Sequence, residues 1–236
     1  MDKTQINQEI VSAFKLALPP VAMAFVDKQP NGVNTIEGEF PSFCTFWRLA
    51  EEKVFYASAD KHYNCPIGAM ILGIEMPKEV QEELGGLVEK MCECSYLSED
   101  EPANIPTLSK KMSGVVYGPL KGFPVEPELV MMWLKPSQAM IYNEVLGCCK
   151  WSESMQSMAL GRPACAVIPT TLNQSPFGMS LGCTGMRTFT EISDDHILAT
   201  LNYKEINSFL ANLETTVRAN KQMKDFYTDH KNKITG

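Results

Sequence analysis

The stretch VAMAFV, residues 21–26, is a continuous apolar run between the double proline at 19–20 and the polar segment DKQP at 27–30. Proline and polar turn residues interrupt regular structure, and a short apolar run between them is typical of a buried strand. LVMMWL, residues 129–134, has the same character. We therefore predict one buried strand in each half of the chain and a fold of the α/β or α+β class.

Other apolar patterns predict the elements around these two strands. Ile6, Ile10 and Phe14 recur at helical spacing and indicate a first helix that ends before the double proline. Further helices are expected at 46–52, at 65–72, after Pro77, at 138–146, and as a closing helix capped by Ser193 or Asp194. Further strands are expected at 54–57, 115–117 and 165–168, followed by a polar loop at 169–178. The segment 173–180 has side-chain donors suited to a small ligand.

The two halves of the chain follow a similar order of strand, helix, second strand and cysteine-bearing turn. Cys44 and Cys65 stand 21 positions apart, and Cys165 and Cys183 stand 18 apart. We predict a single compact unit, residues 1–236, with two strand-helix-strand lobes at 15–98 and 112–215, each with a small mixed sheet. The turns of Cys65 and Cys183 should approach one another. An internal duplication is one interpretation, and two unrelated segments of similar order are the other.

Composition excludes some classes of function. The chain has 236 residues, and its 44% hydrophobic and 21% charged content is near the average of folded globular proteins. The net charge of −7 argues against binding to the phosphate backbone of nucleic acids. No stretch approaches the roughly 20 apolar residues of a membrane-spanning helix, and MDKTQ at the start does not resemble a secretory leader. We expect a cytoplasmic protein that binds neither nucleic acid nor membrane.

Several segments together resemble a known family. These are PVA at 20–22, the spaced pair Cys44 and Cys65, GRPACA at 161–166 and SLGCTGMR at 180–187. They are similar to the prokaryotic family called domain of unknown function 169, which is common in archaea and anaerobic bacteria. The resemblance covers roughly residues 8 to 215 and is most specific at 180–187. It implies the extent of the fold and a set of four cysteines, but no mechanism, because the family has no settled activity.

The four cysteines of this set, Cys44, Cys65, Cys165 and Cys183, are the candidate metal ligands. In a reducing compartment cysteines are more often thiols, metal ligands or redox groups than disulfides. Four thiolates suit zinc or an iron–sulfur cluster. No C-x-x-C pair occurs, which disfavours zinc more than a cluster that takes two ligands from each half. We therefore predict an iron–sulfur cluster, with four inert buried cysteines as the alternative.

Arg187 follows Cys183 by four residues and is the candidate cofactor-binding residue. Its planar guanidinium suits a carboxylate or phosphate, and a structural ion pair is an equal alternative. The remaining cysteines, in Cys92-Glu93-Cys94 and Cys148-Cys149, are interpreted as incidental.

Two other functions stay open at this point. A thiol enzyme would use one cysteine as nucleophile, with His62 as its base. A binding module would hold haem or another apolar cofactor between the halves. The sequence lacks G-x-G-x-x-G, P-loop and G-x-S-x-G patterns, so no catalytic residue is assigned and the question of enzymatic activity stays open. The expected partner is a small molecule or a redox partner protein.

Overall fold

A computed structural model describes residues 1–147 and 162–235, so Cys148 and Cys149 lie outside the described residues. The described chain forms one antiparallel sheet in the order β2-β3-β1-β4-β6-β5. The strands are β1 Val21–Val26, β2 Phe55–Ser58, β3 Gly114–Pro119, β4 Leu129–Leu134, β5 Phe177–Ser180 and β6 Ile197–Asn202. The mixed α/β class and the predicted strands at 21–26 and 129–134 are confirmed.

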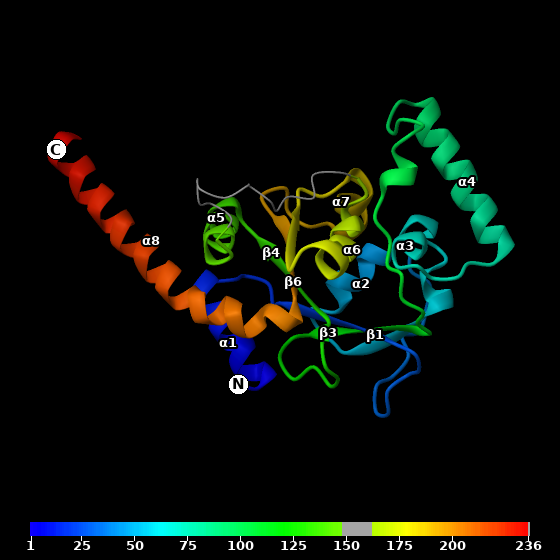
Figure 1. The fold of residues 1–236 in the computed structure, drawn as a ribbon, viewed down its shortest axis with the longest axis horizontal. Helices are drawn as coiled ribbons and strands as arrows, with labels where there is room; N and C mark the ends of the chain where they lie inside the picture. Colours follow the sequence, from blue (N-terminus) through cyan, green and yellow to red (C-terminus); the bar gives the residue numbers. More distant parts are fainter. Residues whose placement is uncertain (148–161, 236) are drawn as a thin grey trace.

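Helices cover both faces of this sheet (Figure 1). One face carries α2 Phe43–Leu49, α3 Pro66–Ile71, the 3-10 turn η3 Ala164–Ala166, α6 Val167–Pro169 and α7 Thr184–Thr190. The other carries α1 Lys3–Phe14, α5 Pro136–Val145 and the first turns of α8 Ile206–Thr235. Strand residues alternate between the two cores, so a sheet covered on both faces needs strands that are apolar throughout. This is why β1 and β4 appear in the sequence as unbroken apolar runs.

The strands of the two halves of the chain follow the same order from the centre of the sheet to its edges. β1 and β4 are neighbours, with β3 then β2 beyond β1, and β6 then β5 beyond β4. The prediction of a separate small mixed sheet in each lobe is therefore wrong. β1 pairs with β4 and joins both halves into one antiparallel sheet. The matching strand order is compatible with an internal duplication, which stays a hypothesis.

Three other expectations are corrected. Residues 165–168 are not a strand but parts of η3 and α6, because a short apolar run fits a buried helical turn as well as a strand. Ser193 and Asp194 do not cap the closing helix, because β6 follows them and α8 begins only at Ile206. The segment 169–178 is not all loop: it contains the π-helical turn η4 Thr170–Gln174 and the start of β5.

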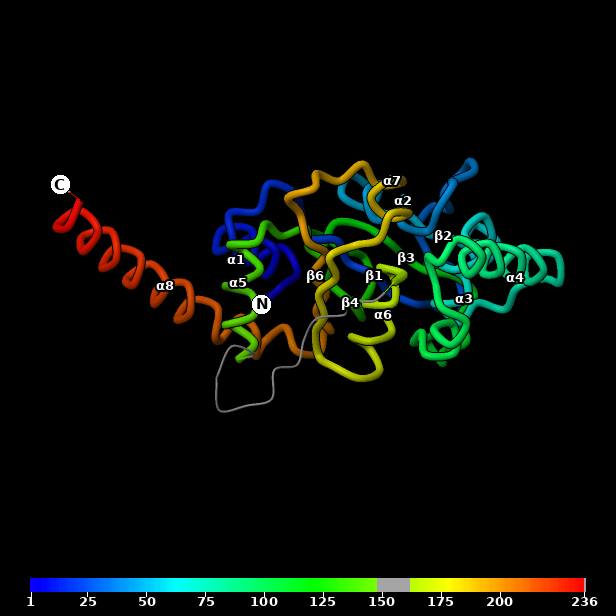
Figure 2. Tube along the Cα trace, turned by 90° about the horizontal axis from the view of Figure 1, so that it is seen from above, coloured from blue at the N-terminus to red at the C-terminus, as the bar shows by residue number. Residues whose placement is uncertain are grey.

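Two helices extend from opposite ends of the molecule (Figures 1 and 2). α4, Lys78–Glu93, lies at one end and has no fully buried residue. The last turns of α8 leave the sheet at the other end, and residues 221–235 are all exposed. Within the described ranges, no helix has both the length and the apolar character needed to cross a bilayer.

Candidate functional site

The four predicted cysteines lie on one face of the sheet, each near the start of a short helical segment. Cys44 is the second residue of α2, and Cys165 lies within η3. Cys65 and Cys183 are the N-cap residues of α3 and α7. All four belong to, or pack against, the same hydrophobic core, and α2 contacts both α3 and α7. The fold thus brings together side chains that are far apart in the sequence.

The thiols are close enough to influence one another electrostatically. Burial raises the pKa of Cys44 well above its ordinary value, and the neighbouring Cys65 and then Cys183 raise it further. Burial likewise raises the pKa of Cys165, with added contributions from Cys44, Cys65 and Cys183. Such effects need short separations in a protein interior. Even so, no three His, Cys, Asp or Glu side chains of the described residues are grouped as ligands of one metal ion.

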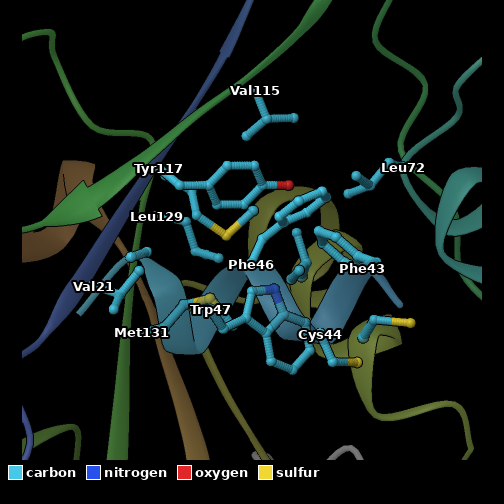
Figure 3. Packing of buried hydrophobic residues seen from close by; sticks show 14 of the residues in the cluster. Val21, Phe43, Cys44, Phe46, Trp47, Leu72, Val115, Tyr117, Leu129 and Met131 are labelled. Atoms are coloured by element: carbon cyan, nitrogen blue, oxygen red, sulfur yellow. The ribbon is translucent and has the colours of Figure 1, made fainter. Parts of the chain in front are cut away.

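The site has a closed side and an open side. Cys44 and Cys165 are 6% and 4% exposed, whereas Cys65 and Cys183 are only half-buried. Figure 3 shows Cys44 at the edge of the core, beside Trp47 and Phe43 of α2. One cysteine of each half therefore lies against the core, and one faces towards solvent.

Hydrogen-bond donors lie around the sulfur atoms. The backbone N–H of Met186 donates to Cys183 Sγ at 3.4 Å. Ser42, which is 3% exposed, accepts from the Cys44 N–H at 3.2 Å and donates to Cys65 Sγ at 3.8 Å. Its hydroxyl also lowers the pKa of Cys44, although less than burial raises it. Donors at helix N-termini favour the anionic form of sulfur, which is the form that binds metals.

Ser42 was not among the residues predicted from the sequence. A serine two residues before Cys44, just ahead of the apolar helix FCTFWRL, is a common N-cap signal and could have revealed it. Nothing in the sequence indicated the packing role of Gly68, at the point where α3 approaches α2. A Cβ atom added there would lie 2.7 Å from Phe43 Cβ and 3.1 Å from Cys65 Sγ. The missing side chain thus allows the two cysteine-bearing helices to approach.

His62 and Tyr117 form a buried pair next to the site. His62 Nδ1 lies 2.9 Å from the Ser58 carbonyl oxygen, so it donates there and leaves Nε2 to accept from the Tyr117 hydroxyl, also at 2.9 Å. Burial lowers the pKa of His62 to about 4, so the ring is neutral. Burial, and then Cys44, raise the pKa of Tyr117. Both ring nitrogens of His62 are therefore occupied, and neither faces a cysteine as a free base.

Arg187 is tied to the segment that carries Cys183. Its Nη2 donates to the carbonyl oxygens of Leu181, at 2.7 Å, and His196, at 3.1 Å. Its Nη1 forms a 3.6 Å ion pair with Asp194, whose side chain is fully in solvent. These contacts hold the turn before α7 in place. Binding of a cofactor or anion by Arg187 stays a prediction.

Comparison with known proteins gives one match. The family described as "Uncharacterised ArCR", domain of unknown function 169, matches residues 9–212. The match has nearly the extent that the sequence motifs predicted. Searches of the curated proteins and of the solved structures found no match.

Proposed function

We propose that this chain, which belongs to the family domain of unknown function 169, binds an iron–sulfur cluster through Cys44, Cys65, Cys165 and Cys183. The observation that carries this proposal is that four separate helical segments bring the four cysteines to one core, where Cys65 and Cys183 both raise the pKa of Cys44 and of Cys165. Inert core cysteines have no reason to gather in this way, because each could fill its own place in the core. Two ligands would come from each half of the sheet.

The surroundings of the thiols suit an anionic cluster. Cys44 and Cys165 are buried and protonated at neutral pH, so loading must displace their protons. The N–H of Met186 and the hydroxyl of Ser42 can donate to ligand sulfur, a contact that tunes cluster potentials. A cluster is larger than a single ion and holds its thiolates farther apart. Among the described residues, the four thiols are neighbours but do not group as ligands of one metal ion. This arrangement is compatible with the wider separation of thiolates around a cluster.

The open side of the site suggests a redox role. An iron–sulfur cluster supplies one-electron transfer. Cys65 and Cys183 are half-buried, which gives electrons a short route to the surface. Leu181 and Phe189, 48% and 41% exposed, add apolar surface on either side of Cys183 in the chain. Such surface favours a redox partner protein over a small molecule. The proposal includes a cytoplasmic location, where thiols stay reduced.

A thiol enzyme is supported less well. His62 is the base that the sequence offered, and its two nitrogens already bind Ser58 and Tyr117. A raised pKa makes Cys44 and Cys165 weak nucleophiles. Only Cys65 and Cys183 would remain for such chemistry.

The test is iron and sulfide analysis of protein prepared and reconstituted without oxygen. We expect equal amounts of iron and acid-labile sulfide, together with a broad visible absorbance that bleaches on reduction. Cys44→Ser and Cys165→Ser should abolish both, because a buried serine is a poor cluster ligand. Cys92→Ser is the matched control, since Cys92 lies on α4 and does not shift the pKa of Cys44 or Cys165.

Two results would overturn the proposal. One is protein without iron after reconstitution, although alkylation shows all four thiols to be reduced. The other is full colour in all four single variants. Stoichiometric zinc without sulfide would replace the cluster by a single ion at the same residues.

A further inference from the structure

The end of α8 presents apolar side chains that nothing in the described chain covers. We call residues 221–235 outer α8. Of the eight large hydrophobic residues exposed in the described ranges, four lie here: Met223, Phe226, Tyr227 and Ile234, at 47% to 70% exposure. Met223, Tyr227 and Ile234 are four and seven residues apart, so they share one face of the helix. Figures 1 and 2 both show this segment extending away from the sheet.

An unsupported helix of this kind needs a partner. Isolated helices of about 15 residues are marginal in water, because nucleation is costly and only packing of an apolar face compensates. Exposed apolar side chains gathered on one element commonly mark an interaction site. Outer α8 therefore has the character of one half of an interface.

Charge indicates the kind of partner. Outer α8 carries four lysines and two aspartates, a net charge of +2, and the rest of the chain therefore carries −9. Lys221 is paired with Asp225 at 3.1 Å. Lys224, Lys231 and Lys233 have no ion pair within the described ranges. A basic helix with an apolar stripe fits an acidic surface that has apolar side chains of its own.

The opposite end of the same chain offers such a surface. Residues 78–101, which we call the α4 arm, carry eight acidic and two basic side chains, a net charge of −6. Val80, Leu84, Leu87 and Met91 of α4 recur at helical spacing and are only half-buried. Beyond them lies an open hollow of about 680 Å³, whose lining includes Glu89, Glu93, Glu99 and Leu97.

We infer that outer α8 of one copy packs along the α4 arm of a second copy of this chain. The two segments are opposite in charge, and both leave apolar side chains exposed or half-buried. Their lengths are also similar, about 22 Å against about 24 Å for α4. They lie at opposite ends of one molecule, so the contact must join two molecules (Figures 1 and 2). Two copies related by a two-fold axis would form it twice, which closes the assembly as a dimer.

The test is the mass of the full chain in solution, measured by light scattering and sedimentation over a range of concentrations. We expect a dimer. Lys224→Glu/Lys231→Glu/Lys233→Glu and, separately, Glu83→Lys/Glu89→Lys/Glu93→Lys should each weaken dimerisation at least about tenfold, because like charges then face each other. An equimolar mixture of the two variants should dimerise again, because the heterodimer has one contact in which both partners are reversed and one in which both are wild type.

Controls separate this contact from a general charge effect. Lys28→Glu/Lys53→Glu/Lys121→Glu makes the same change of charge at exposed positions elsewhere and should leave the dimer intact. Tyr227→Asp should dissociate it, with an unchanged near-ultraviolet spectrum of the buried aromatic residues as evidence of folding. A monomeric wild type overturns the inference. So does a monomer that binds phosphatidylserine vesicles through outer α8, or a mixture of reversed variants that stays monomeric.

Discussion

The two halves of the sheet hold equivalent places but build their parts of the site differently. In the first half, Cys44 and Cys65 start two α-helices and share Ser42. In the second half, Cys165 lies in a 3-10 turn, and Cys183 follows a turn held by Arg187. Yet each half supplies one buried and one half-buried thiol. The half-buried thiols of the two halves therefore share a place at a helix N-cap, whereas the buried thiols share only their depth.

Thiol reactivity tests this shared depth and should give the largest effect. In iron-free protein, Cys65 and Cys183 should react with iodoacetamide at least about a thousandfold faster than Cys44 and Cys165. A buried thiol reacts only when the protein opens, which costs several kcal/mol. Mass spectrometry of peptides over time measures the four rates. Similar rates for the two cysteines of either half would break the comparison.

Each half of the chain contains a buried pair of hydrogen-bonded polar side chains, but only the pair of the first half includes a group that ionises between pH 4 and 7. His62 and Tyr117 form the pair of the first half, while two hydroxyls, those of Thr171 and Thr200, meet at 2.7 Å in the second. The pKa of His62 is about 4 when folded and 6.5 when unfolded, so between these values the unfolded state binds more protons. The contribution of His62 to stability should therefore fall by about 3 kcal/mol as the pH drops from 7 to 4.

Urea unfolding at several pH values measures this dependence. His62→Gln should remove about 3 kcal/mol from the difference in stability between pH 7 and pH 4, whatever its cost at neutral pH. Thr171→Ser is the matched change in the second half and should leave that difference as in the wild type. A His62→Gln protein with unaltered pH dependence would show that His62 ionises normally in the fold.

A glycine near each half-buried cysteine, Gly68 near Cys65 and Gly182 next to Cys183, allows close packing. Replacing either should have a smaller effect on stability than the loss of His62 ionisation. Gly68→Ala would push α3 from α2 and should cost about 1–3 kcal/mol by overpacking. Gly182, just before Cys183, has φ +91°, and a Cβ there would lie 2.6 Å from Met186 Cε. Gly182→Ala should cost about 1–2 kcal/mol through its backbone conformation. Chemical denaturation measures both.

Gly85→Ala is the control for these two changes. Gly85 lies on α4 with nothing within 4 Å of an added Cβ, so alanine should stabilise the helix by about 0.5–1 kcal/mol. If alanine at Gly68 or at Gly182 also raised stability, that glycine would not be needed for close approach.

Local patterns predicted the central elements of the fold. β1 and β4 were predicted with their observed bounds, and α1, α3, α4 and α5 to within a few residues, because their periodicity and prolines are local signals. The prediction of a strand at 165–168 was wrong, because four consecutive apolar residues do not distinguish a strand from a buried helical turn. The order of the strands depends on pairing between distant residues, which no local signal contains.

The site was predicted unevenly for a similar reason. The four cysteines came from motifs that the family shares, and the fold places all four on one core. Ser42 had a local N-cap signal, but its contact with Cys65 spans 23 positions of sequence and the His62–Tyr117 contact spans 55. Gly68 matters through its approach to Phe43 of another helix. Arg187 was read as a ligand-binding group from its neighbours in sequence, and its carbonyl partners emerged only from the fold.

The joint between β1 and β4 has a mechanical consequence. It is the shortest ladder of the sheet, pairing only Val21–Met23 with Leu129–Met131, yet it is the one strand pairing that connects the two halves. A cofactor held by two cysteines from each half would act as a crosslink across this joint. Its loss would loosen the sheet from the middle outward, so amide hydrogens of Leu129–Met131 would exchange before those deeper in either half.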